Sequence, residues 1–245
     1  MKKHRILITG SADGLGQMAA KALVDQGHQV VMHARDEKRA KEALKKVPGA
    51  THCLIGDLSN TEETRQLAFQ ANALGNFSAI IHNAGVYEAS PEAILAVNVL
   101  APYLLTCLIQ KPQRLIYLSS GMHLQGHANL KSLKASQGVS YSDSKLLLVQ
   151  LCKAVARKWP DVYANAVDPG WVPTKMGGPG APDDLQKGYE TQVWLAVSDD
   201  PKALVSGRYF FHQKEARSNP EGDDITLQNE LMKRCASMTG VPFPA

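Results

Sequence analysis

The stretch RILITGSADGLGQMAAKALVDQGHQVVMHAR, residues 5–35, decides the fold. Residues 5–9 form a short apolar run typical of a buried strand, and a glycine-rich turn follows directly. Apolar residues then recur at 15, 18, 19, 22 and 23, a spacing that predicts a helix over 15–26. A further apolar run over 29–33 predicts a second strand. Strand, glycine turn, helix and strand form the unit that binds dinucleotides.

The three glycines of this turn have separate tasks. Gly10 permits the tight turn, Gly14 lets the backbone approach a pyrophosphate, and Gly16 allows close packing at the start of the helix. The free amide groups and the positive dipole end of that helix then face the phosphates. A glycine triple alone is weak evidence, but its place between a strand and a helix makes it strong.

A second signal is the run YSDSK, which contains Tyr141 and Lys145. Residues four apart lie on one face of a helix, and the following run KLLLVQLCKAVARKW has helical spacing. We expect the ammonium of Lys145 to lower the pKa of Tyr141 from its ordinary value of about 10, so that the phenol can exchange a proton near neutrality. An isolated pair of this kind is usually only an exposed tyrosine beside a lysine. The dinucleotide unit favours the catalytic interpretation.

The glycine spacing TGxxxGxG resembles that of the short-chain dehydrogenase/reductase family, classical type, and the resemblance covers nearly the whole chain. Further matching segments are HCLIGDLS, AIIHNAGV, AVNVLAPYLLT, RLIYLSSGMH and VDPGWVPTKM. The pattern is most similar to the retinol-dehydrogenase-like, NADP-preferring branch. Two segments depart from it: His82 replaces the first asparagine of the NNAG turn, and twenty residues separate Ser120 from Tyr141, more than in many members.

The resemblance implies hydride transfer between a nicotinamide and a carbonyl carbon, or the reverse from an alcohol. Tyr141 would donate the proton, and Ser120, which position matching favours over Ser119, would hydrogen-bond the same oxygen. Lys145 would also bind the nicotinamide ribose, and Asn98 would hold a water that connects Lys145 to solvent. The cofactor carries the redox chemistry, and the protein supplies orientation and electrostatics.

The resemblance also implies a set of cofactor-binding residues, which includes both members of the YxxxK pair. They are Gly10, Ser11, Asp13, Gly14, Leu15, Gly16, Arg35, Asp57, Leu58, Asn83, Ala84, Gly85, Tyr141, Lys145, Pro169, Gly170, Val172 and Thr174. Arg35 follows the second strand, where an arginine suits the 2′-phosphate of NADP and an acid suits the 2′-hydroxyl of NAD. Asp36 is next to it, and Asp13 stands where many NADP enzymes have a basic residue. We expect NADP to be favoured over NAD.

Along the whole chain, strands and helices alternate, which indicates an α/β fold. Helices are expected at 37–47, 61–73, 91–110, 141–158 and 184–198, and strands at 51–55, 78–82, 113–119, 162–167 and 207–211. The predicted architecture is a Rossmann-type, doubly wound parallel sheet of about seven strands with helices on both faces, a three-layer α/β/α arrangement. We expect a single NAD(P)-binding domain, residues 1–245, in which 212–245 form a surface loop and a terminal helix.

Composition excludes several other classes of protein. A net charge of +4, from 27 basic and 23 acidic residues, is too small to indicate a nucleic-acid partner. The four cysteines form no CxxC pair, so neither a disulfide framework nor a metal site is expected. No stretch approaches the roughly 20 apolar residues of a membrane span. The sequence therefore predicts a cytoplasmic protein with no membrane partner.

Several other residues are conspicuous in the sequence but are not assigned to the catalytic or cofactor-binding sets. We expect His82 to be a hydrogen-bonded turn histidine, and His123 and His127 to be solvated loop histidines. Trp171 either lines the nicotinamide end of the site or packs beneath its loop, and the sequence leaves both open. Met176 and the following GGPGAP form either a mobile lid over the substrate, as the resemblance implies, or an ordinary loop. The loop after Ser120 is polar, which does not support a large apolar substrate.

Other functions remain to be weighed against a carbonyl or alcohol oxidoreductase. A non-catalytic NAD(P)-binding sensor could use the same fold, but sensors of that type generally lack the tyrosine–lysine pair. A sugar-nucleotide epimerase or dehydratase would have another glycine spacing and a larger C-terminal domain. The resemblance implies a homo-dimer or homo-tetramer that pairs through residues 91–110 and 141–158, and the apolar surface of 141–158 exceeds one buried face. The expected partner is a small-molecule carbonyl or alcohol substrate.

Overall fold

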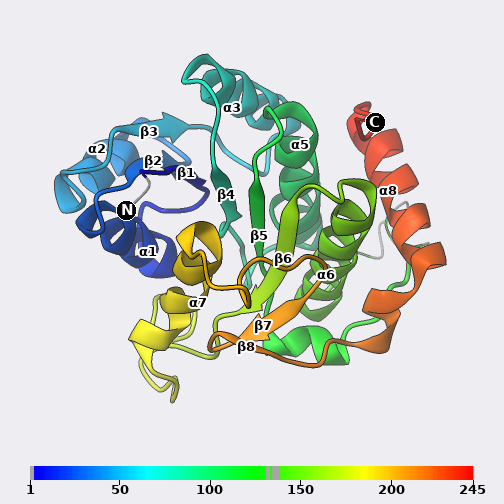
Figure 1. The fold of residues 1–245 in the computed structure, drawn as a ribbon. Helices are drawn as coiled ribbons and strands as arrows, with labels where there is room; N and C mark the ends of the chain where they lie inside the picture. The colour runs from blue at the N-terminus through cyan, green and yellow to red at the C-terminus, as the bar shows by residue number, and fades with distance from the viewer. Residues whose placement is uncertain (1–2, 131–132, 134–137, 245) are drawn as a thin grey trace.

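The computed structural model describes residues 3–130, 133 and 138–244, and the alternating strands and helices are present in it (Figure 1). The strands are β1 (Arg5–Ile8), β2 (Gln29–Ala34), β3 (His52–Ile55), β4 (Ala79–His82), β5 (Arg114–Leu118), β6 (Tyr163–Asp168), β7 (Tyr209–Phe211) and β8 (Lys214–Glu215). The α-helices are α1 (Gly14–Asp25), α2 (Glu37–Lys46), α3 (Thr61–Ala73), α4 (Pro91–Leu95), α5 (Ala101–Leu108), α6 (Tyr141–Lys158), α7 (Leu185–Val197) and α8 (Ile225–Thr239). Shorter helical segments are η1 (Ala96–Leu100), η2 (Gly121–Gln125) and η3 (Pro220–Asp223).

The strands form one sheet in the order β3-β2-β1-β4-β5-β6-β7-β8, and only the last pair is antiparallel. Both faces of this sheet are covered. Along β1, Ile6 and Ile8 belong to a core shared with α1, α2 and α7, whereas Leu7 belongs to a core shared with α3, α5, α6 and α8. Successive strand residues point to opposite faces, so a strand buried on both sides is apolar throughout. The doubly wound, three-layer prediction is confirmed.

The strand order reverses between β1 and β4, which lie side by side. The helix after β1 packs on one face of the sheet, and the helical run after β4 packs on the other. At such a reversal the two connections diverge and leave a crevice at the carboxyl ends of the strands. This crevice is where the sequence places its dinucleotide unit.

The eighth strand is absent from the sequence prediction, which gave about seven. His212 and Gln213 both adopt left-handed backbone conformations, with φ of 48° and 61°. Two such residues make a hairpin turn of the type that is usually built from glycine or asparagine. Neither residue type occupies this turn, so the hairpin that pairs β7 with β8 was not visible in the sequence.

The long helix expected at 91–110 is a continuous helical run made of α4, η1 and α5. Its middle turn, η1, is a π-helix, a local widening that is frequent at functional sites. By length and composition alone, this run of Pro91–Leu108 could cross a membrane, and 56% of it is buried within the chain. No other helix in the described residues passes that test. Its packing in one core with α3 and α6 is that of an internal helix.

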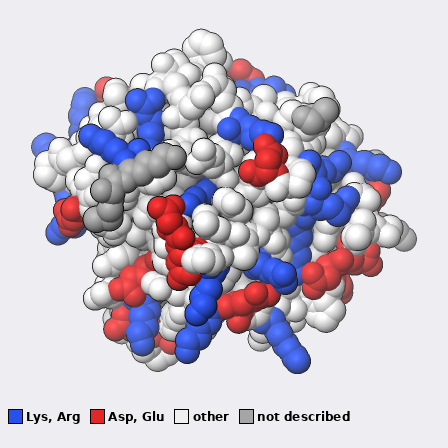
Figure 2. All heavy atoms as spheres, in the orientation of Figure 1, with Lys and Arg blue, Asp and Glu red and all other residues white. Residues whose placement is uncertain are grey.

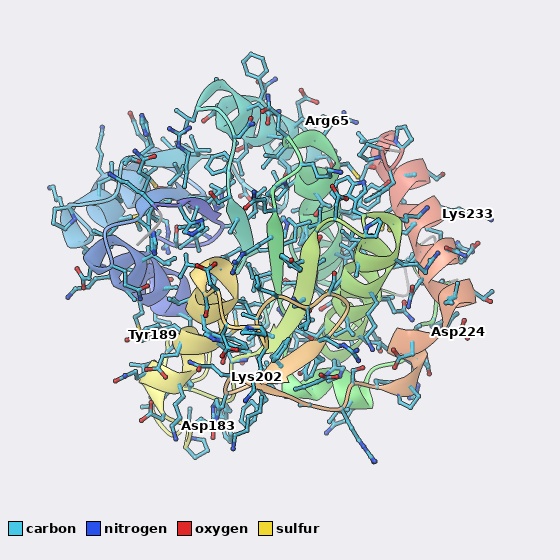
Figure 3. The ribbon with its side chains drawn as sticks, in the orientation of Figure 1. Arg65, Asp183, Tyr189, Lys202, Asp224 and Lys233 are labelled. Atoms are coloured by element: carbon cyan, nitrogen blue, oxygen red, sulfur yellow. The ribbon has the colours of Figure 1, made fainter. Side chains whose placement is uncertain are left out.

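The C-terminal helix covers the apolar face of α6. Asp224 caps the start of α8 by accepting hydrogen bonds from the backbone of Thr226 (2.8 Å) and Leu227 (3.1 Å). Leu231 and its neighbours on the inner side of α8 join the core of α6, and Lys233 lies on the outer side (Figure 3). The apolar surface of 141–158 that suggested a second subunit is therefore buried within the chain. It gives no argument for an oligomer.

Charged side chains are distributed without a dominant sign. On the face shown in Figure 2, basic and acidic residues are interspersed. Surface ion pairs such as Lys41–Glu37 (3.4 Å) and Arg208–Glu215 (3.2 Å) join many of them. This mixture agrees with the small net charge of +4.

Truncating Leu231 to alanine tests the role of α8 in the fold. Leu231 is fully buried between α8 and the core of α6, so Leu231→Ala should lower the free energy of unfolding by about 2–5 kcal/mol through loss of apolar burial and the cavity left behind. Met238→Ala, at an exposed position on the same helix, should change it by less than about 0.5 kcal/mol. Urea denaturation measures both, and equal effects would show that α8 does not contribute to the core.

Candidate active site

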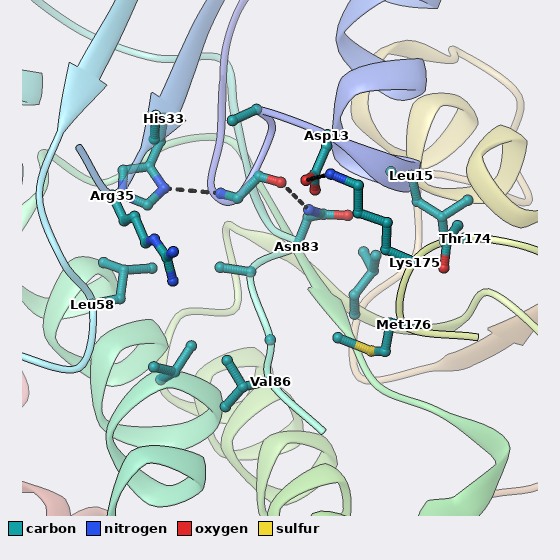
Figure 4. A pocket seen from close by; sticks show the side chains of 18 of the residues that line it. Asp13, Leu15, His33, Arg35, Leu58, Asn83, Val86, Thr174, Lys175 and Met176 are labelled. Carbon is teal, nitrogen blue, oxygen red and sulfur yellow. Dashed lines mark hydrogen bonds and ion pairs between the residues drawn. The ribbon is translucent and has the colours of Figure 1, made fainter. Parts of the chain in front are cut away.

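A cavity of about 530 Å³ opens at the carboxyl ends of the parallel strands (Figure 4). It brings together most of the residues that the sequence singled out. Those lining it are Gly10, Asp13, Gly14, Leu15, Arg35, Asp57, Leu58, Asn83, Ala84, Gly85, Tyr141, Lys145, Pro169 and Thr174. Ser11, Gly16, Asn98, Ser120, Gly170 and Val172 are not in its lining and lie behind or beside it.

The turn after β1 packs directly on the turn after β4. A Cβ at position 10 would lie 2.8 Å from Ala84 Cα, and one at position 16 would lie 2.4 Å from Asn83 Nδ2, so glycine is required at both places. The Asn83 amide donates hydrogen bonds to the carbonyl oxygens of Thr9 (2.9 Å) and Gly10 (3.1 Å). Together these contacts fix the floor of the cavity.

His33 supports the glycine turn and was missed by the sequence interpretation. The backbone N–H of Gly10 donates to His33 Nδ1 (2.9 Å), so the ring proton lies on Nε2 and donates to the Gly56 carbonyl (2.8 Å). Burial lowers the pKa of His33, which keeps the ring neutral. The Ser11 hydroxyl accepts a hydrogen bond from the His33 backbone (2.9 Å), which explains why Ser11 is buried behind the cavity. The signal in the sequence that could have revealed this role was His33 itself, a polar residue within the apolar run of β2.

The N-terminus of α1 leaves its backbone donors available. Asp13 occupies the N-cap position, yet its side chain makes no capping hydrogen bond. Its carboxylate instead binds Arg39 (2.8 Å) and Lys175 (3.3 Å). Burial acts to raise the pKa of Asp13, but the hydrogen bonds from the two cations outweigh it and lower the pKa. The uncapped amides and the helix dipole favour an anion at this point.

Two further groups at this end of the cavity come from the ends of β2 and β3. The Arg35 side chain is 68% exposed and lies 3.6 Å from the Asp36 carboxylate. Asp36 meanwhile caps α2 by accepting from the Arg39 backbone (2.8 Å), so it is already engaged. Asp57 accepts hydrogen bonds from the Ser59 hydroxyl (2.7 Å) and backbone (2.8 Å), which lower its pKa.

The opposite end of the cavity contains the tyrosine and lysine at the start of α6. Ser140 and Asp143 form a capping box that fixes this start. Lys145 Nζ lies 5.4 Å from the Tyr141 ring centroid and donates a hydrogen bond to the Leu118 carbonyl (2.8 Å). The prediction that the two side chains project together is confirmed.

The two adjacent serines after β5 have different partners. The Ser119 hydroxyl donates to the backbone carbonyl of Lys145 (3.0 Å), which ties β5 to α6. The Ser120 hydroxyl accepts a hydrogen bond from the Met122 backbone (3.3 Å), and it lies near enough to the Tyr141 phenol to act on the pKa of that group, which it lowers. Ser120 is therefore the serine that acts on the tyrosine, although Ser119 is the one that lines the cavity.

Asn98 lies in the π-helical turn and is fully buried. Its amide oxygen accepts from the Val86 backbone (2.8 Å), and its nitrogen donates to the Val86 carbonyl (3.0 Å) and the Ser144 hydroxyl (3.0 Å). A Cβ at position 85 would lie 3.2 Å from Lys145 Nζ and 3.4 Å from Asn98 Oδ1. Both polar groups thus flank Gly85.

The expected effect of Lys145 on the Tyr141 pKa is wrong. Burial raises the pKa of Tyr141 to about 12, and nearby Asp168 and Tyr87 act in the same direction. Burial also lowers the pKa of Lys145 to about 8, because this residue is only 3% exposed. Loss of solvent dominates the Tyr141 pKa, and the group that acts to lower it is Ser120 rather than Lys145. The phenol is therefore protonated near neutrality.

Apolar side chains rim the cavity above the tyrosine. Tyr87 packs edge-to-face on Tyr141 with ring centroids 4.8 Å apart. Met176 lines the cavity and is half exposed, and the exposed indole of Trp171 donates to the Gly177 carbonyl (2.7 Å) beside it. Trp171 thus stabilises its own loop at the surface rather than packing beneath it. The sequence argued against a large apolar substrate because the loop after Ser120 is polar. The side chains that form this rim come from other segments and are apolar.

The histidine expectations have mixed outcomes. His82 is hydrogen-bonded, since its Nε2 lies 3.2 Å from the Thr106 hydroxyl, although it ends β4 instead of lying in a turn. His127 is exposed, as expected. His123 is fully buried, so its assignment as a solvated loop residue is wrong. Among the described residues, no three His, Cys, Asp or Glu side chains are grouped so that they could hold a metal ion.

Comparisons with known proteins identify relatives over the whole chain. The family described as short chain dehydrogenase matches residues 4–184. An uncharacterized oxidoreductase from Emericella nidulans is 43% identical, and the alignment covers 98% of each chain. The short-chain dehydrogenase chyC from Penicillium rubens is 42% identical over 98% of this chain and 99% of its own. Human retinol dehydrogenase 13 is 27% identical over 98% of this chain and 86% of its own.

Solved structures share the fold at lower identity. A protein of uncharacterized function from Mycobacterium paratuberculosis superimposes with a TM-score of 0.84 at 21% identity, covering 99% of this chain and 95% of that one. A blue fluorescent protein from a metagenomic library, in complex with NADPH, has a TM-score of 0.71 at 20% identity, covering 85% and 95%.

The burial of Lys145 gives a prediction for stability. Because its folded-state pKa of about 8 is below the ordinary 10.5, desolvation destabilises the fold fully below pH 8, and this cost disappears as pH rises to 10.5. Lys145→Met should therefore raise the free energy of unfolding at pH 7 by on the order of 1–3 kcal/mol, with a smaller gain at pH 10. Denaturant titrations at both pH values measure the difference.

Lys187→Met removes an exposed lysine from α7 and serves as the control, with a change below about 0.5 kcal/mol at either pH. A Lys145→Met variant that is less stable than the wild type at pH 7 would contradict the desolvation argument.

Proposed function

Because the chain belongs to the short chain dehydrogenase family, we propose that it is an NADP-dependent oxidoreductase that reduces a ketone or aldehyde, or oxidises the corresponding alcohol. The observation that carries this proposal is the cavity that contains both the glycine turn and the Tyr141–Lys145 pair, in which Lys145 Nζ lies 5.4 Å from the Tyr141 ring centroid. We further propose that the whole chain acts as one nucleotide-binding domain.

The cavity fits a nicotinamide dinucleotide. The uncapped N-terminus of α1 offers backbone donors for a pyrophosphate, and within the described part of the chain only Thr174 Cγ2, at 4.0 Å, would approach a Cβ at Gly14. The exposed Arg35, at the same end of the cavity, suits a further phosphate. The residues that would hold the cofactor are those predicted from the sequence, with Ser11 and Val172 supporting the loops from behind. The bound nicotinamide would supply the hydride.

Tyr141 is proposed as the proton donor to the carbonyl oxygen. Its pKa of about 12 keeps the phenol protonated at neutral pH, as a donor must be in the direction of reduction. The Ser120 hydroxyl would donate to the same oxygen and stabilise the negative charge that develops on it. Lys145 and Asn98, which flank Gly85, would return a proton to Tyr141 from solvent. The apolar rim of Tyr87 and Met176 would receive the rest of the substrate.

NADP is proposed over NAD because of the groups at the end of β2. Arg35 is exposed at this end of the cavity, while Asp36, the acid that could bind a ribose 2′-hydroxyl, is occupied as the cap of α2. Asp13, which stood against NADP in the sequence, is neutralised by Arg39 and Lys175. The NADPH complex of a structural relative is consistent with this choice.

The second candidate is a non-catalytic NAD(P)-binding sensor on the same fold. A sensor would have no need to keep Asn98, Ser120, Tyr141 and Lys145 together in one site. Wild-type protein that binds NADPH tightly but reduces no member of a panel of aldehydes, ketones and quinones would favour the sensor.

Removal of the Tyr141 hydroxyl tests the catalytic assignment. Tyr141→Phe should lower kcat by about a hundredfold to ten-thousandfold, because the variant has no proton to donate, while NADPH affinity stays within about twofold. Tyr163→Phe, on a partly exposed tyrosine of β6, is the control and should keep wild-type turnover. Turnover retained in Tyr141→Phe would exclude this tyrosine as the donor.

Removal of Arg35 tests the choice of nucleotide. Arg35→Ala should weaken NADPH binding by roughly tenfold to a hundredfold, the worth of a charge-assisted hydrogen bond, and leave NADH binding almost unchanged. Lys38→Ala removes the same charge from an exposed position three residues away and should affect neither nucleotide strongly. Nicotinamide fluorescence measures both affinities. Equal losses for NADPH and NADH would contradict a phosphate contact.

A further inference from the structure

The segment before α8 binds the loop that follows Ser120. Asn219 is only 8% exposed, and its side-chain amide donates hydrogen bonds to the carbonyl oxygens of His123 (3.3 Å), Leu124 (3.3 Å) and Gly126 (3.0 Å). These carbonyls lie at the end of η2, where a helical segment leaves acceptors unsatisfied. A residue close to the C-terminus therefore caps the helical turn that begins at Ser120.

His123 continues this connection to Ser120 itself. The backbone N–H of Asn219 donates to His123 Nε2 (3.1 Å). A backbone N–H can only donate, so Nε2 carries a lone pair and the proton of the neutral ring lies on Nδ1. Nδ1 is 2.7 Å from the Ser120 carbonyl oxygen and donates to it. Burial lowers the pKa of His123, which preserves this tautomer.

The same loop is attached on its other side to α6. The His127 backbone donates to Asp143 (2.8 Å), in the first turn of α6, and the Ala128 backbone donates to Glu221 (2.7 Å). A Cβ at position 126 would lie 2.5 Å from the Ser142 carbonyl oxygen. The loop is therefore held between the helix that carries Tyr141 and the segment that carries Asn219.

We propose that His123 and Asn219 are positioning residues, which hold the Ser120 hydroxyl against the Tyr141 phenol; this inference rests on the proposed function. The Ser120 carbonyl accepts from both the backbone (3.0 Å) and the ring of His123, so the residue's backbone is fixed from the C-terminal side. Because the backbone is fixed, the position of the Ser120 hydroxyl depends only on rotation about the Cα–Cβ bond. A displacement of about 1 Å in a catalytic group can lower a rate by about a hundredfold.

The C-terminal segment thus has a catalytic consequence without reaching the substrate. Lys153 anchors it on α6 through Ser218 (2.7 Å) and Asp223 (2.5 Å), and Gln150 donates to the Glu221 carbonyl (2.8 Å). These contacts connect the packing of α8 to the geometry of Ser120. They also explain why a histidine in a polar loop is fully buried.

The test compares four variants in the full-length protein. His123→Phe and Asn219→Ala should lower kcat by about tenfold to a hundredfold, with KM for the carbonyl and affinity for NADPH each within about threefold. His123→Asn should recover much of the rate, because its amide nitrogen occupies the place of Nδ1 and can donate to the Ser120 carbonyl. Asn229→Ala, which loses one surface hydrogen bond to Arg157, is the matched control and should keep wild-type kcat.

Wild-type kcat in His123→Phe, or a fall in NADPH affinity that parallels the fall in kcat, would overturn the proposal. Hydrogen exchange at the amides of residues 121–126 gives a readout that does not need turnover. Faster exchange there in Asn219→Ala but not in Asn229→Ala supports the connection, and unchanged exchange contradicts it. Wild-type protein that binds NADPH but reduces no carbonyl overturns the proposed function, and hydrogen exchange then judges the connection separately.

Discussion

The site depends on one topological constraint, the reversal of strand order between β1 and β4. Neighbouring parallel strands there send their helices to opposite faces of the sheet, so their carboxyl ends border a crevice. The two turns touch so closely that Gly10 and Gly16 have no room for a side chain beside Ala84 and Asn83. This contact aligns the uncapped end of α1 with the ends of β5 and β6. Every proposed role depends on that alignment.

Burial at this edge controls the chemistry. Lys145 is removed from solvent against the end of β5, which lowers its pKa to about 8, and Tyr141 is partly enclosed, which raises its pKa to about 12. A protonated phenol beside a donor hydroxyl is suited to deliver a proton to a carbonyl oxygen. The buried ammonium of Lys145 destabilises the fold. A residue with a purely structural role would have no reason to be a lysine at this position, so its burial indicates a functional role.

The sequence predicted the elements well because apolar spacing reports burial directly. The bounds of 61–73 and 141–158 agree with α3 and α6, and Tyr141 and Lys145 share the cavity. It failed where the outcome depends on surroundings distant in the chain. The Tyr141 pKa was wrong because proximity to Lys145 is visible in sequence and desolvation is not. His123 is buried by Asn219, 96 residues away, and the surplus apolar face of α6 is covered by α8. The turn at His212 and Gln213 has no glycine to mark it.

The most direct test of the account is the crystal structure of the complex with NADP⁺. We predict that this structure will show the pyrophosphate at the first turn of α1, the 2′-phosphate on Arg35, and the nicotinamide beside Tyr141 and Lys145. A 2′-phosphate that points to solvent would remove the argument for NADP, and a nicotinamide remote from Tyr141 would contradict the central claim that the reversal between β1 and β4 builds a redox site around that tyrosine.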